Sequence, residues 1–442
     1  MRLIPAHIRT TLRSEGFQQY VRNTGWMLGG KAIQMSLTFW ITAWVGRYLG
    51  PELYGKWNYA QSVGTLFLIL ATVGLETVVT RNIIQHPESR SRVIGSAIVI
   101  RLLATFFSLV LLGITVMTVP QDILTSQLTL LVVISSIFQA LDVFEWFFQS
   151  QVEARYSVQV RFVSVLLFAG LQLALILNGA SLVAFGLAFF VKNVLTGLGL
   201  ALVYGFRIEN LRQLRFSRAE VRALLLDAWP IAIADIVIIL YLKMDQLMIR
   251  WLMDETAVGH YSSALRFSEI WYFVAPLVMQ ALYPAVVKAR NESRERYKRR
   301  MQLVMQVMVA VGFLIALPTA FLGPWVLEQP LFFGPAFAPA GGVLVIHVWT
   351  LLFVMMGTAA SRSLVLEQMQ HVILYRALTG TLLNFGLNLF LIPRYGIEGA
   401  AIASLIAQMV TSWLGYAFFP RTLPLFKMQT KALLMMGWGL RK

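Results

Sequence analysis

The chain has 442 residues, of which 58% are hydrophobic and 13% are charged, and its formal net charge is +16. Soluble domains average about 25% charged residues, so this composition excludes an ordinary soluble protein and predicts one that lives in a lipid bilayer. Because the sequence contains no cysteine, disulfide frameworks, zinc-thiolate sites and thiol nucleophiles are excluded as well.

Apolar stretches follow one another along nearly the whole chain. A transmembrane helix needs roughly 20 mostly apolar residues, and the sequence predicts about twelve such spans. They are continuous apolar runs, which is typical of an α-helical bundle and not of a β-barrel with its alternating strands. In chain order the predicted spans are 24–46, 57–80, 94–118, 124–149, 160–178, 181–205, 223–250, 259–287, 301–323, 339–361, 371–392 and 397–419.

The basic residues are distributed unevenly between the two sides of the predicted bundle. If the N-terminus is cytoplasmic, most arginines and lysines lie on the cytoplasmic side, and the opposite side holds only Arg47, Lys56, Arg250 and Arg394. This asymmetry follows the positive-inside rule and predicts that both termini are cytoplasmic. Anionic membrane lipids are expected contacts of these charges. No nucleic-acid partner is expected, because the basic runs lack interleaved aromatic residues.

The predicted connections leave no room for a large domain outside the membrane. The longest are residues 205–222, residues 287–300 and the C-terminal tail. On the non-cytoplasmic side the longest segment is GPWVLEQPLFFGPAFAPA at 323–340, whose only ionisable residue is Glu328. A membrane polymerase or ligase would be expected to carry a large loop with catalytic residues there. The sequence therefore predicts that the protein is not an enzyme.

Two pairs of similar segments indicate an internal duplication. GLQLALI at 170–176 recurs as GLNLFLI at 386–392, and RYLGPELYGKWNYA at 47–60 is similar to RWLMDETAVGHYSSA at 250–264. The matches occur in the same order and at similar offsets. They predict two six-helix halves, residues 1–214 and 215–442. An even number of spans in each half gives both the same orientation, so parallel repeats with a central cavity between them are expected.

Three longer segments carry a resemblance to a known family. They are RYLGPELYGKWNYAQSV at 47–63, KMDQLMIRWLMDETAVGHYSSALRFSEIWYFVAP at 243–276 and LIPRYGIEGAAIASLIAQ at 391–408. These segments resemble the polysaccharide-repeat-unit (O-antigen and exopolysaccharide) flippases of the multidrug, oligosaccharidyl-lipid and polysaccharide (MOP) exporter superfamily. The resemblance covers nearly the whole chain.

The resemblance implies a fold, an activity and a location. The expected fold is a V-shaped bundle of twelve helices like that of the MATE transporters. The expected activity is the transfer, by alternating access, of an oligosaccharide linked to undecaprenyl pyrophosphate across the bacterial inner (cytoplasmic) membrane. A polysaccharide polymerase and a chain-length regulator are candidate partners.

Several cations fall inside or at the ends of predicted spans, where an ionisable side chain needs a partner or a water-filled cavity. Lys31, Arg101 and Lys192 have no acidic residue within their own spans. A pyrophosphate is one anion that such cations neutralise, arginine by a bidentate contact and lysine as a point charge. The cations predicted to line the cavity are Lys31, Arg47, Lys243, Arg250 and Arg266. The alternative is that any of them only snorkels to a membrane interface or satisfies a helix end, and snorkelling is favoured above all for Arg47 and Arg250.

Carboxylates in the spans are candidates for coupling transport to an ion gradient. The predicted set is Glu76, Asp142, Glu145, Asp235 and Glu269, and protons, sodium and no ion at all remain open. For Glu269 the alternative is a structural ion pair with Arg266, three residues earlier. Asp142 and Glu145 have the same spacing with like charge, so either one is protonated or both face water.

No cofactor or metal site is expected. Gly29-Gly30-Lys31 is not followed by Ser or Thr, so it is no phosphate-binding loop, and the five histidines show no metal-ligand spacing. The alternative function is ion-coupled export of small organic molecules by a relative of the same superfamily. An exporter of cationic drugs would favour an acidic cavity with few buried cations, which the mixed set of intramembrane charges does not match.

Overall fold

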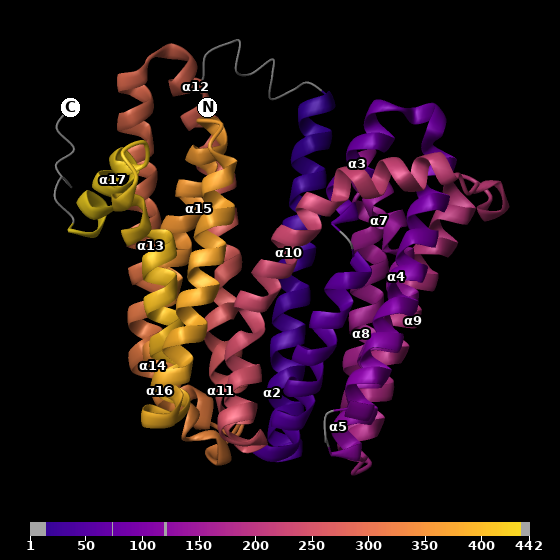
Figure 1. The fold of residues 1–442 in the computed structure, drawn as a ribbon, viewed down its shortest axis with the longest axis horizontal. Coiled ribbons are helices and arrows are strands. Elements are labelled where there is room, and N and C mark those ends of the chain that lie inside the picture. Colours follow the sequence, from indigo (N-terminus) through magenta and orange to yellow (C-terminus); the bar gives the residue numbers. More distant parts are fainter. Residues whose placement is uncertain (1–14, 73, 119–121, 435–442) are drawn as a thin grey trace. The chain divides into compact units, whose positions relative to one another are not determined.

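The computed structural model describes residues 15–72, 74–118 and 122–434 (Figure 1), and the side chains of residues 15–33, 71 and 370 lie outside the described part. Every regular element in these ranges is a helix, so the predicted all-α fold is confirmed. The α-helices are α2 (Glu15–Thr72), α3 (Leu75–Gln85), α4 (Arg90–Thr118), α5 (Ile123–Ile134), α6 (Ser136–Gln139), α7 (Val143–Ser150), α8 (Arg155–Leu177), α9 (Leu182–Arg207), α10 (Arg218–Leu252), α11 (Glu255–Glu269), α12 (Val274–Glu292), α13 (Arg294–Glu328), α14 (Ala340–His347), α15 (Thr350–Leu366), α16 (Gln370–Ser412) and α17 (Leu423–Leu433).

Short 3₁₀ turns join several of these helices. They are η1 (Pro87–Ser89), η2 (Ala140–Asp142), η3 (Leu211–Gln213), η4 (Ile270–Phe273), η5 (Pro335–Phe337) and η6 (Leu414–Phe418). Two of them, η2 and η4, lie where the sequence predicts uninterrupted spans at 124–149 and 259–287. The helix α13 continues through Pro324 to Glu328, beyond the predicted end of its span at residue 323.

The described residues form ten helical segments that are long and apolar enough to cross a membrane. Two of these segments, Gln34–Gln85 with 52 residues and His371–Ser412 with 42 residues, each overlap two of the predicted spans. A glycine with non-helical backbone divides the long helix in each case, Gly50 (φ 73°, ψ 170°) in α2 and Gly396 (φ 58°, ψ −139°) in α16. Positive φ suits glycine, which has no Cβ. The chain is thus a multi-pass membrane protein, and twelve crossings stay a prediction.

The helices gather into two compact units. The N-terminal unit comprises the chain up to Thr42 together with Val63–Ile236, and the C-terminal unit comprises Ala43–Ser62 together with the chain from Val237 onwards. The predicted halves, residues 1–214 and 215–442, were defined by similarity between sequence segments, whereas these units are defined by compact packing. The two halves therefore stay a prediction.

The core of the N-terminal unit is aromatic. Phe144, Phe147 and Phe148 of α7 are buried against Tyr204 of α9, and the ring centroids of Phe144 and Tyr204 are 4.7 Å apart. Helix α8 packs along α9 (Figure 1). Helices α3 and α4 pack against α7 and cover the same core. Such rings contribute large apolar contact areas, which hold together the broken segment α5–α6–η2–α7.

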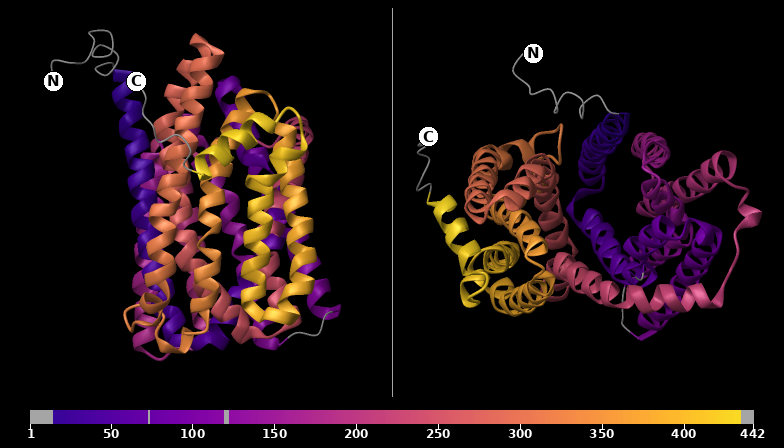
Figure 2. Two further views of the ribbon diagram at one scale, coloured as in Figure 1. Left: turned by 90° about the vertical axis from the view of Figure 1, so that its left-hand side faces the viewer. Right: turned by 90° about the horizontal axis from the view of Figure 1, so that it is seen from above.

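The core of the C-terminal unit is rich in methionine. Helices α12, α13, α15 and α16 run side by side (Figure 1, with further views in Figure 2), and α17 packs against α13. The methionines between them are fully buried: Met301, Met305, Met308, Met355 and Met356. Because methionine is unbranched and flexible, it fills irregular gaps between helices.

Two glycines from the similar segments 47–60 and 250–264 meet in the C-terminal unit. A Cβ added to Gly55 of α2 would lie 1.7 Å from the carbonyl oxygen of Glu255, and one added to Gly259 of α11 would lie 2.0 Å from that of Pro51. Glu255 and Pro51 each precede the glycine of their own segment by four residues, so the contact is reciprocal. Small residues let helix backbones approach this closely, which explains why residues 43–62 belong to this unit.

We expect Gly55→Ala to destabilise the protein, because the new methyl group would overlap a carbonyl oxygen and push the helices apart. Overpacking of this kind costs about 1–3 kcal/mol. Reversible unfolding in mixed micelles, followed by tryptophan fluorescence, measures the effect. Gly170→Ala is the matched control: no atom lies within 4 Å of its Cβ position, and alanine favours a helix by about 0.5–1 kcal/mol. Equal stability of the two variants would contradict the importance of the glycine contact.

Candidate functional site

A polar pocket lies within the N-terminal unit. Its volume is about 460 Å³, and α2, α3, α4, α6, α7, α8, α10 and η2 contribute to its wall. Six ionisable side chains line it: Glu76, Arg101, Asp142, Glu145, Arg161 and Asp235. Four of the residues predicted for ion coupling thus share one pocket, together with two arginines.

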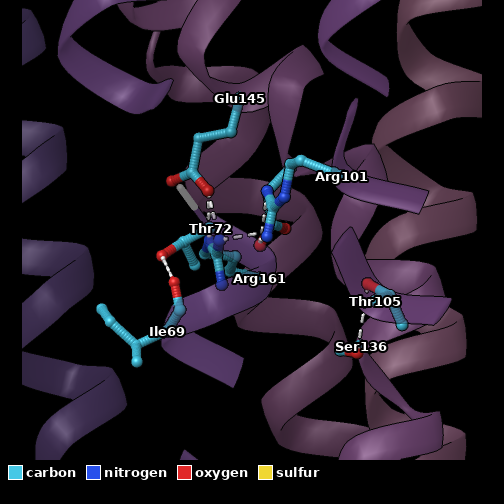
Figure 3. A network of polar contacts seen from close by, with 8 residues as sticks. Ile69, Thr72, Arg101, Thr105, Ser136, Glu145 and Arg161 are labelled. Atoms are coloured by element: carbon cyan, nitrogen blue, oxygen red, sulfur yellow. Dashed lines mark hydrogen bonds and ion pairs between the residues drawn. The ribbon is translucent and has the colours of Figure 1, made fainter. Parts of the chain in front are cut away.

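Arg161 of α8 neutralises the two neighbouring carboxylates Asp142 and Glu145. Its Nε donates a hydrogen bond of 2.7 Å to Glu145 Oε2 (Figure 3). Its Nη2 contacts both Glu145 and, at 3.4 Å, Asp142 Oδ1. An arginine fork between two carboxylates removes most of their mutual repulsion. This arrangement provides a counter-charge that sequence reasoning missed, because Arg161 lies at the very start of the predicted span 160–178, where an arginine is expected to reach the cytoplasmic side.

Arg101 of α4 is the most deeply buried charge of the pocket. Its side chain is only 4% exposed, and its Nη1 lies 4.0 Å from Asp142 Oδ2. The guanidinium carbon lies 5.1 Å from the ring centroid of Trp146, within the range of a cation–π contact. Nε and Nη1 nevertheless have no hydrogen-bond partner among the described residues. Arg101, which has no acidic residue in its own span, is therefore compensated only in part, by Asp142 of another segment.

Glu76 of α3 and Asp235 of α10 complete the charged lining. Glu76 is exposed to the pocket and Asp235 is half-buried, and neither forms an ion pair or hydrogen bond with a residue that the structure describes. The pocket has four carboxylates and two guanidinium groups, so its lining is acidic on balance. Asp142 and Glu145 are held by Arg161, whereas Glu76 and Asp235 are the two lining carboxylates without an ion pair among the described residues.

Two of the predicted cavity cations have structural partners in the C-terminal unit. Arg47 is exposed and its Nη1 donates to the carbonyl oxygen of Pro330. Arg250 Nη2 forms an ion pair of 2.6 Å with Glu255 Oε1, and its guanidinium lies 5.9 Å from the ring of Tyr59. These contacts fit the alternative in which both residues stabilise helix ends.

The other predicted cations of this unit form a cluster with Glu269. Lys243 of α10 and Arg266 of α11 interact electrostatically with each other and with Glu269, and all three side chains are half-buried. Two cations share one carboxylate, so we call this group the basic cluster. The fifth predicted cation, Lys31, lies in α2, but its side chain is outside the described residues.

Sequence reasoning also missed a buried carboxylate in the C-terminal unit as a site residue. Asp245 of α10 contacts Tyr261 of α11 together with Asn388 and Ser404 of α16. The available signal was the pair Asn384 and Asn388, which lie one turn apart in the apolar segment LLNFGLNLFLI. Among the described residues no group of three His, Cys, Asp or Glu side chains could hold a metal ion.

The sequence matches a protein family and is similar to individual membrane proteins. A family model described as "polysaccharide biosynthesis protein" matches residues 20–290. The uncharacterized membrane protein EpsK of Bacillus subtilis is 25% identical over 351 residues, covering 71% of this chain and 65% of EpsK. The probable low-salt glycan biosynthesis flippase Agl15 of Haloferax volcanii is 23% identical over 227 residues, covering 51% of this chain and 47% of Agl15. Both alignments thus span less than two thirds of these relatives.

Solved structures of transporters share the fold. The lipid II flippase MurJ in an inward closed conformation gives a TM-score of 0.69 at 15% identity, with 92% of this chain and 90% of MurJ covered. An inward-facing multidrug resistance MATE family transporter of the MOP superfamily gives 0.67 at 15% identity, with 91% and 96% covered. The predicted MATE-like helical fold is confirmed.

We expect Arg161→Ala to lower the free energy of unfolding, because it leaves Glu145 without its ion-pair partner and Asp142 with only the 4.0 Å contact to Arg101. Removing one partner of a fully buried pair costs about 3–5 kcal/mol, and the one-third exposure of Arg161 reduces this to about 1–3 kcal/mol. Reversible unfolding in mixed micelles measures the loss. Arg155→Ala, which removes an exposed arginine from the same helix, is the control.

Adding Asp142→Asn and Glu145→Gln to Arg161→Ala should restore most of the lost stability, since positions 142 and 145 then no longer carry like charges. If the triple variant were as unstable as Arg161→Ala alone, the loss would come from packing and not from charge.

Proposed function

We propose that this chain, which belongs to the family of polysaccharide biosynthesis proteins, is a flippase for undecaprenyl-pyrophosphate-linked oligosaccharide repeat units. It transfers them across the inner membrane of a bacterium by alternating access, and both of its termini are cytoplasmic. Agl15, which is similar in sequence, is named a probable low-salt glycan biosynthesis flippase, and this supports a glycan cargo. The likeness to the lipid II flippase MurJ supports a fold that is compatible with such a cargo. A polysaccharide polymerase and a chain-length regulator are the proposed partners.

The observation that carries this proposal is the basic cluster of Lys243, Arg266 and Glu269. These charges lie in helices that are otherwise apolar enough to cross a membrane. Charges in such helices are costly and mark sites of function. Because the cluster has one more cation than carboxylate, an anionic group of the substrate would complete its compensation.

A pyrophosphate suits the two cations of the cluster. Arg266 offers a planar fork that binds two phosphate oxygens, and Lys243 supplies a point charge. We assign the same role to Lys31, whereas Arg47 and Arg250 would reach the substrate only after leaving Pro330 and Glu255. The glycan contributes weaker contacts elsewhere in the proposed central cavity.

The pocket of the N-terminal unit is proposed to couple transport to an ion. Glu76 and Asp235 take up the cation or proton, and Arg101 and Arg161 form ion pairs with Asp142 and Glu145. Glu269 is the fifth proposed coupling residue, since it responds to the charge of Lys243 and Arg266. Protonation of an intramembrane carboxylate changes which helices attract one another, which is how an ion gradient can drive a conformational change.

The acidic balance of that pocket supports a second candidate function, ion-coupled export of small organic molecules. A pocket with four carboxylates and two arginines would accept an organic cation. The likeness to a multidrug resistance MATE transporter concerns the fold alone and does not decide between the two cargoes.

Alternating access requires that the non-cytoplasmic end open and close. The reciprocal contact of Gly55 and Gly259 joins the two similar segments at the end that the positive-inside rule assigns to this side. We propose that this contact is the closed external gate. It separates when the substrate leaves.

Replacing Lys243 by alanine should slow translocation at least about tenfold, because a charge-assisted hydrogen bond contributes about 1.5–3 kcal/mol. The measurement is the initial rate of transfer of a polyprenyl-pyrophosphate-linked oligosaccharide in proteoliposomes, with and without a pH or sodium gradient. Lys288→Ala, which removes an exposed lysine from α12, is the matched control.

A normal rate in Lys243→Ala and Arg266→Ala would refute the assignment of the basic cluster. If the wild-type protein moved no lipid-linked glycan but exported an organic cation, the second candidate function would replace the first.

Spin labels test the proposed gate. Because the sequence has no native cysteine, the pair Glu52→Cys and Met253→Cys gives a protein with only two thiols, both at exposed positions beside the glycine contact. Double electron–electron resonance should give one short distance at rest and an additional longer distance in the presence of substrate. A single distance under all conditions during active transport would contradict the gate.

A further inference from the structure

The connection between α9 and α10 is fixed along the beginning of α4 in the N-terminal unit. Ser91 Oγ donates a hydrogen bond to the carbonyl oxygen of Gln213, and the backbone N–H of Arg215 donates one of 3.3 Å to the carbonyl oxygen of Ser91. A Cβ added to Gly95 would lie 2.5 Å from the carbonyl oxygen of Arg215, so the two backbones touch here. Figures 1 and 2 show the connection at the outer edge of the unit. Its backbone faces α4, whereas the side chains of Arg212 and Arg215 are exposed.

Every acidic residue of the segment 207–229 already has a basic partner. The three carboxylates form ion pairs with arginines of α3 and α4, which lie on the inner side of the connection. The pairs are Asp227 with Arg81, Glu209 with Arg90 at 2.8 Å, and Glu220 with Arg92 at 3.8 Å. Partly exposed pairs of this kind add little to stability. Their consequence is that no carboxylate of the segment is left to pair with its own arginines.

Five arginines of the same segment therefore remain without a carboxylate. All five side chains are exposed, and none of them forms an ion pair with a residue that the structure describes. They are Arg207, Arg212, Arg215, Arg218 and Arg222. Like charges so close in sequence repel one another, and an anion from outside the chain would relieve this repulsion.

Large apolar side chains are exposed among these arginines. Phe206 at the end of α9 is 85% exposed, Phe216 in the connection is 55% exposed, and Trp229 on α10 is 56% exposed. The opposite face of α10 packs Leu224 and Ala228 into the aromatic core of the unit. Arginines that alternate with exposed aromatic rings are typical of helices lying at the interface of a membrane.

We propose that Arg212, Arg215 and Arg218 bind the headgroup phosphate of an anionic phospholipid, whose acyl chains lie over Phe216 and Trp229. A guanidinium group offers parallel N–H donors that match two phosphate oxygens. The positive-inside rule assigns this end of the unit to the cytoplasm, so the lipid belongs to the cytoplasmic leaflet. Binding of the lipid does not depend on which cargo the protein carries.

The surroundings of the arginines favour a lipid over other anions. A free phosphate would need the arginines alone, and an acidic protein would need a surface that faces water. The connection instead joins two segments that are long and apolar enough to cross a membrane, Leu182–Arg207 and Arg218–Leu252. The exposed rings thus continue the lipid-facing surface up to the arginines, where headgroups meet acyl chains.

Native mass spectrometry of the purified full-length protein, released from a neutral detergent, tests the site by counting bound lipids. Phosphatidylglycerol and phosphatidylcholine with the same acyl chains are titrated in parallel. We expect the first phosphatidylglycerol to bind at a lower concentration than the first phosphatidylcholine. Replacing Arg212, Arg215 and Arg218 together by glutamine should raise the apparent Kd for that phosphatidylglycerol at least about tenfold, because each basic residue near the headgroups adds to the attraction.

A second triple variant separates a site from general attraction of charge. Lys298→Gln, Arg299→Gln and Arg300→Gln remove the same number of charges from exposed positions of α13 and should leave the first phosphatidylglycerol bound as in the wild type. The proposal is overturned if both triple variants lose affinity equally, or if phosphatidylcholine binds as tightly as phosphatidylglycerol.

Two soluble anions test the other sources of negative charge. Glycerol 3-phosphate and polyglutamate are added in place of the lipid, and we expect neither to bind with the affinity of phosphatidylglycerol. Equal affinity for the first would assign the arginines to a free phosphate, and equal affinity for the second would assign them to an acidic protein. Either result would overturn the lipid site. All of these measurements are made without a glycan, so their outcome is separate from that of the flippase function.

Discussion

Charges inside an apolar helical bundle must be compensated by other groups of the bundle, because lipid offers neither water nor counter-ions. The arrangement of the helices follows this constraint in both units. In the N-terminal unit, Arg161 binds two carboxylates from the neighbouring segment, and Arg101 lies between Asp142 and an indole ring. In the C-terminal unit, α11 and both parts of α16 supply hydrogen bonds to Asp245 of α10. Each charge thus fixes which helices are neighbours, while the apolar side chains fill the space between them.

Much of the architecture could be predicted from the sequence, since apolar runs of sufficient length leave few structures other than membrane helices. The breaks inside those runs are harder to predict. Between α5 and α7 the chain passes through a short helix and a 3₁₀ turn, although SSIFQALDVFEWFF contains no proline or glycine. Packing of Phe144, Phe147 and Phe148 around Tyr204 decides that geometry, and these contacts join residues far apart in the chain.

The candidate site was predictable in its acidic members and not in their partners. A carboxylate in an apolar span is visible in the sequence, and Glu76, Asp142, Glu145 and Asp235 do share a pocket. Arg161 was not predicted as a partner, because its position near the end of a predicted span suggested contact with solvent. The partners of Asp245 were not predicted for a different reason. Asparagine and serine carry no charge, and Asn388 and Ser404 are 143 and 159 residues away from it in sequence.

The reciprocal contact between Gly55 and Gly259 bears on the origin of the fold. Each glycine faces the carbonyl oxygen four residues before the other, which is the pattern of an isologous interface in a two-fold symmetric dimer. A polypeptide with one copy of the segment could make the same contact with a second molecule of itself. Gene duplication and fusion would convert that dimer interface into an intramolecular one. The motif would then be a remnant of self-association, preserved where the symmetry axis passes between the two backbones.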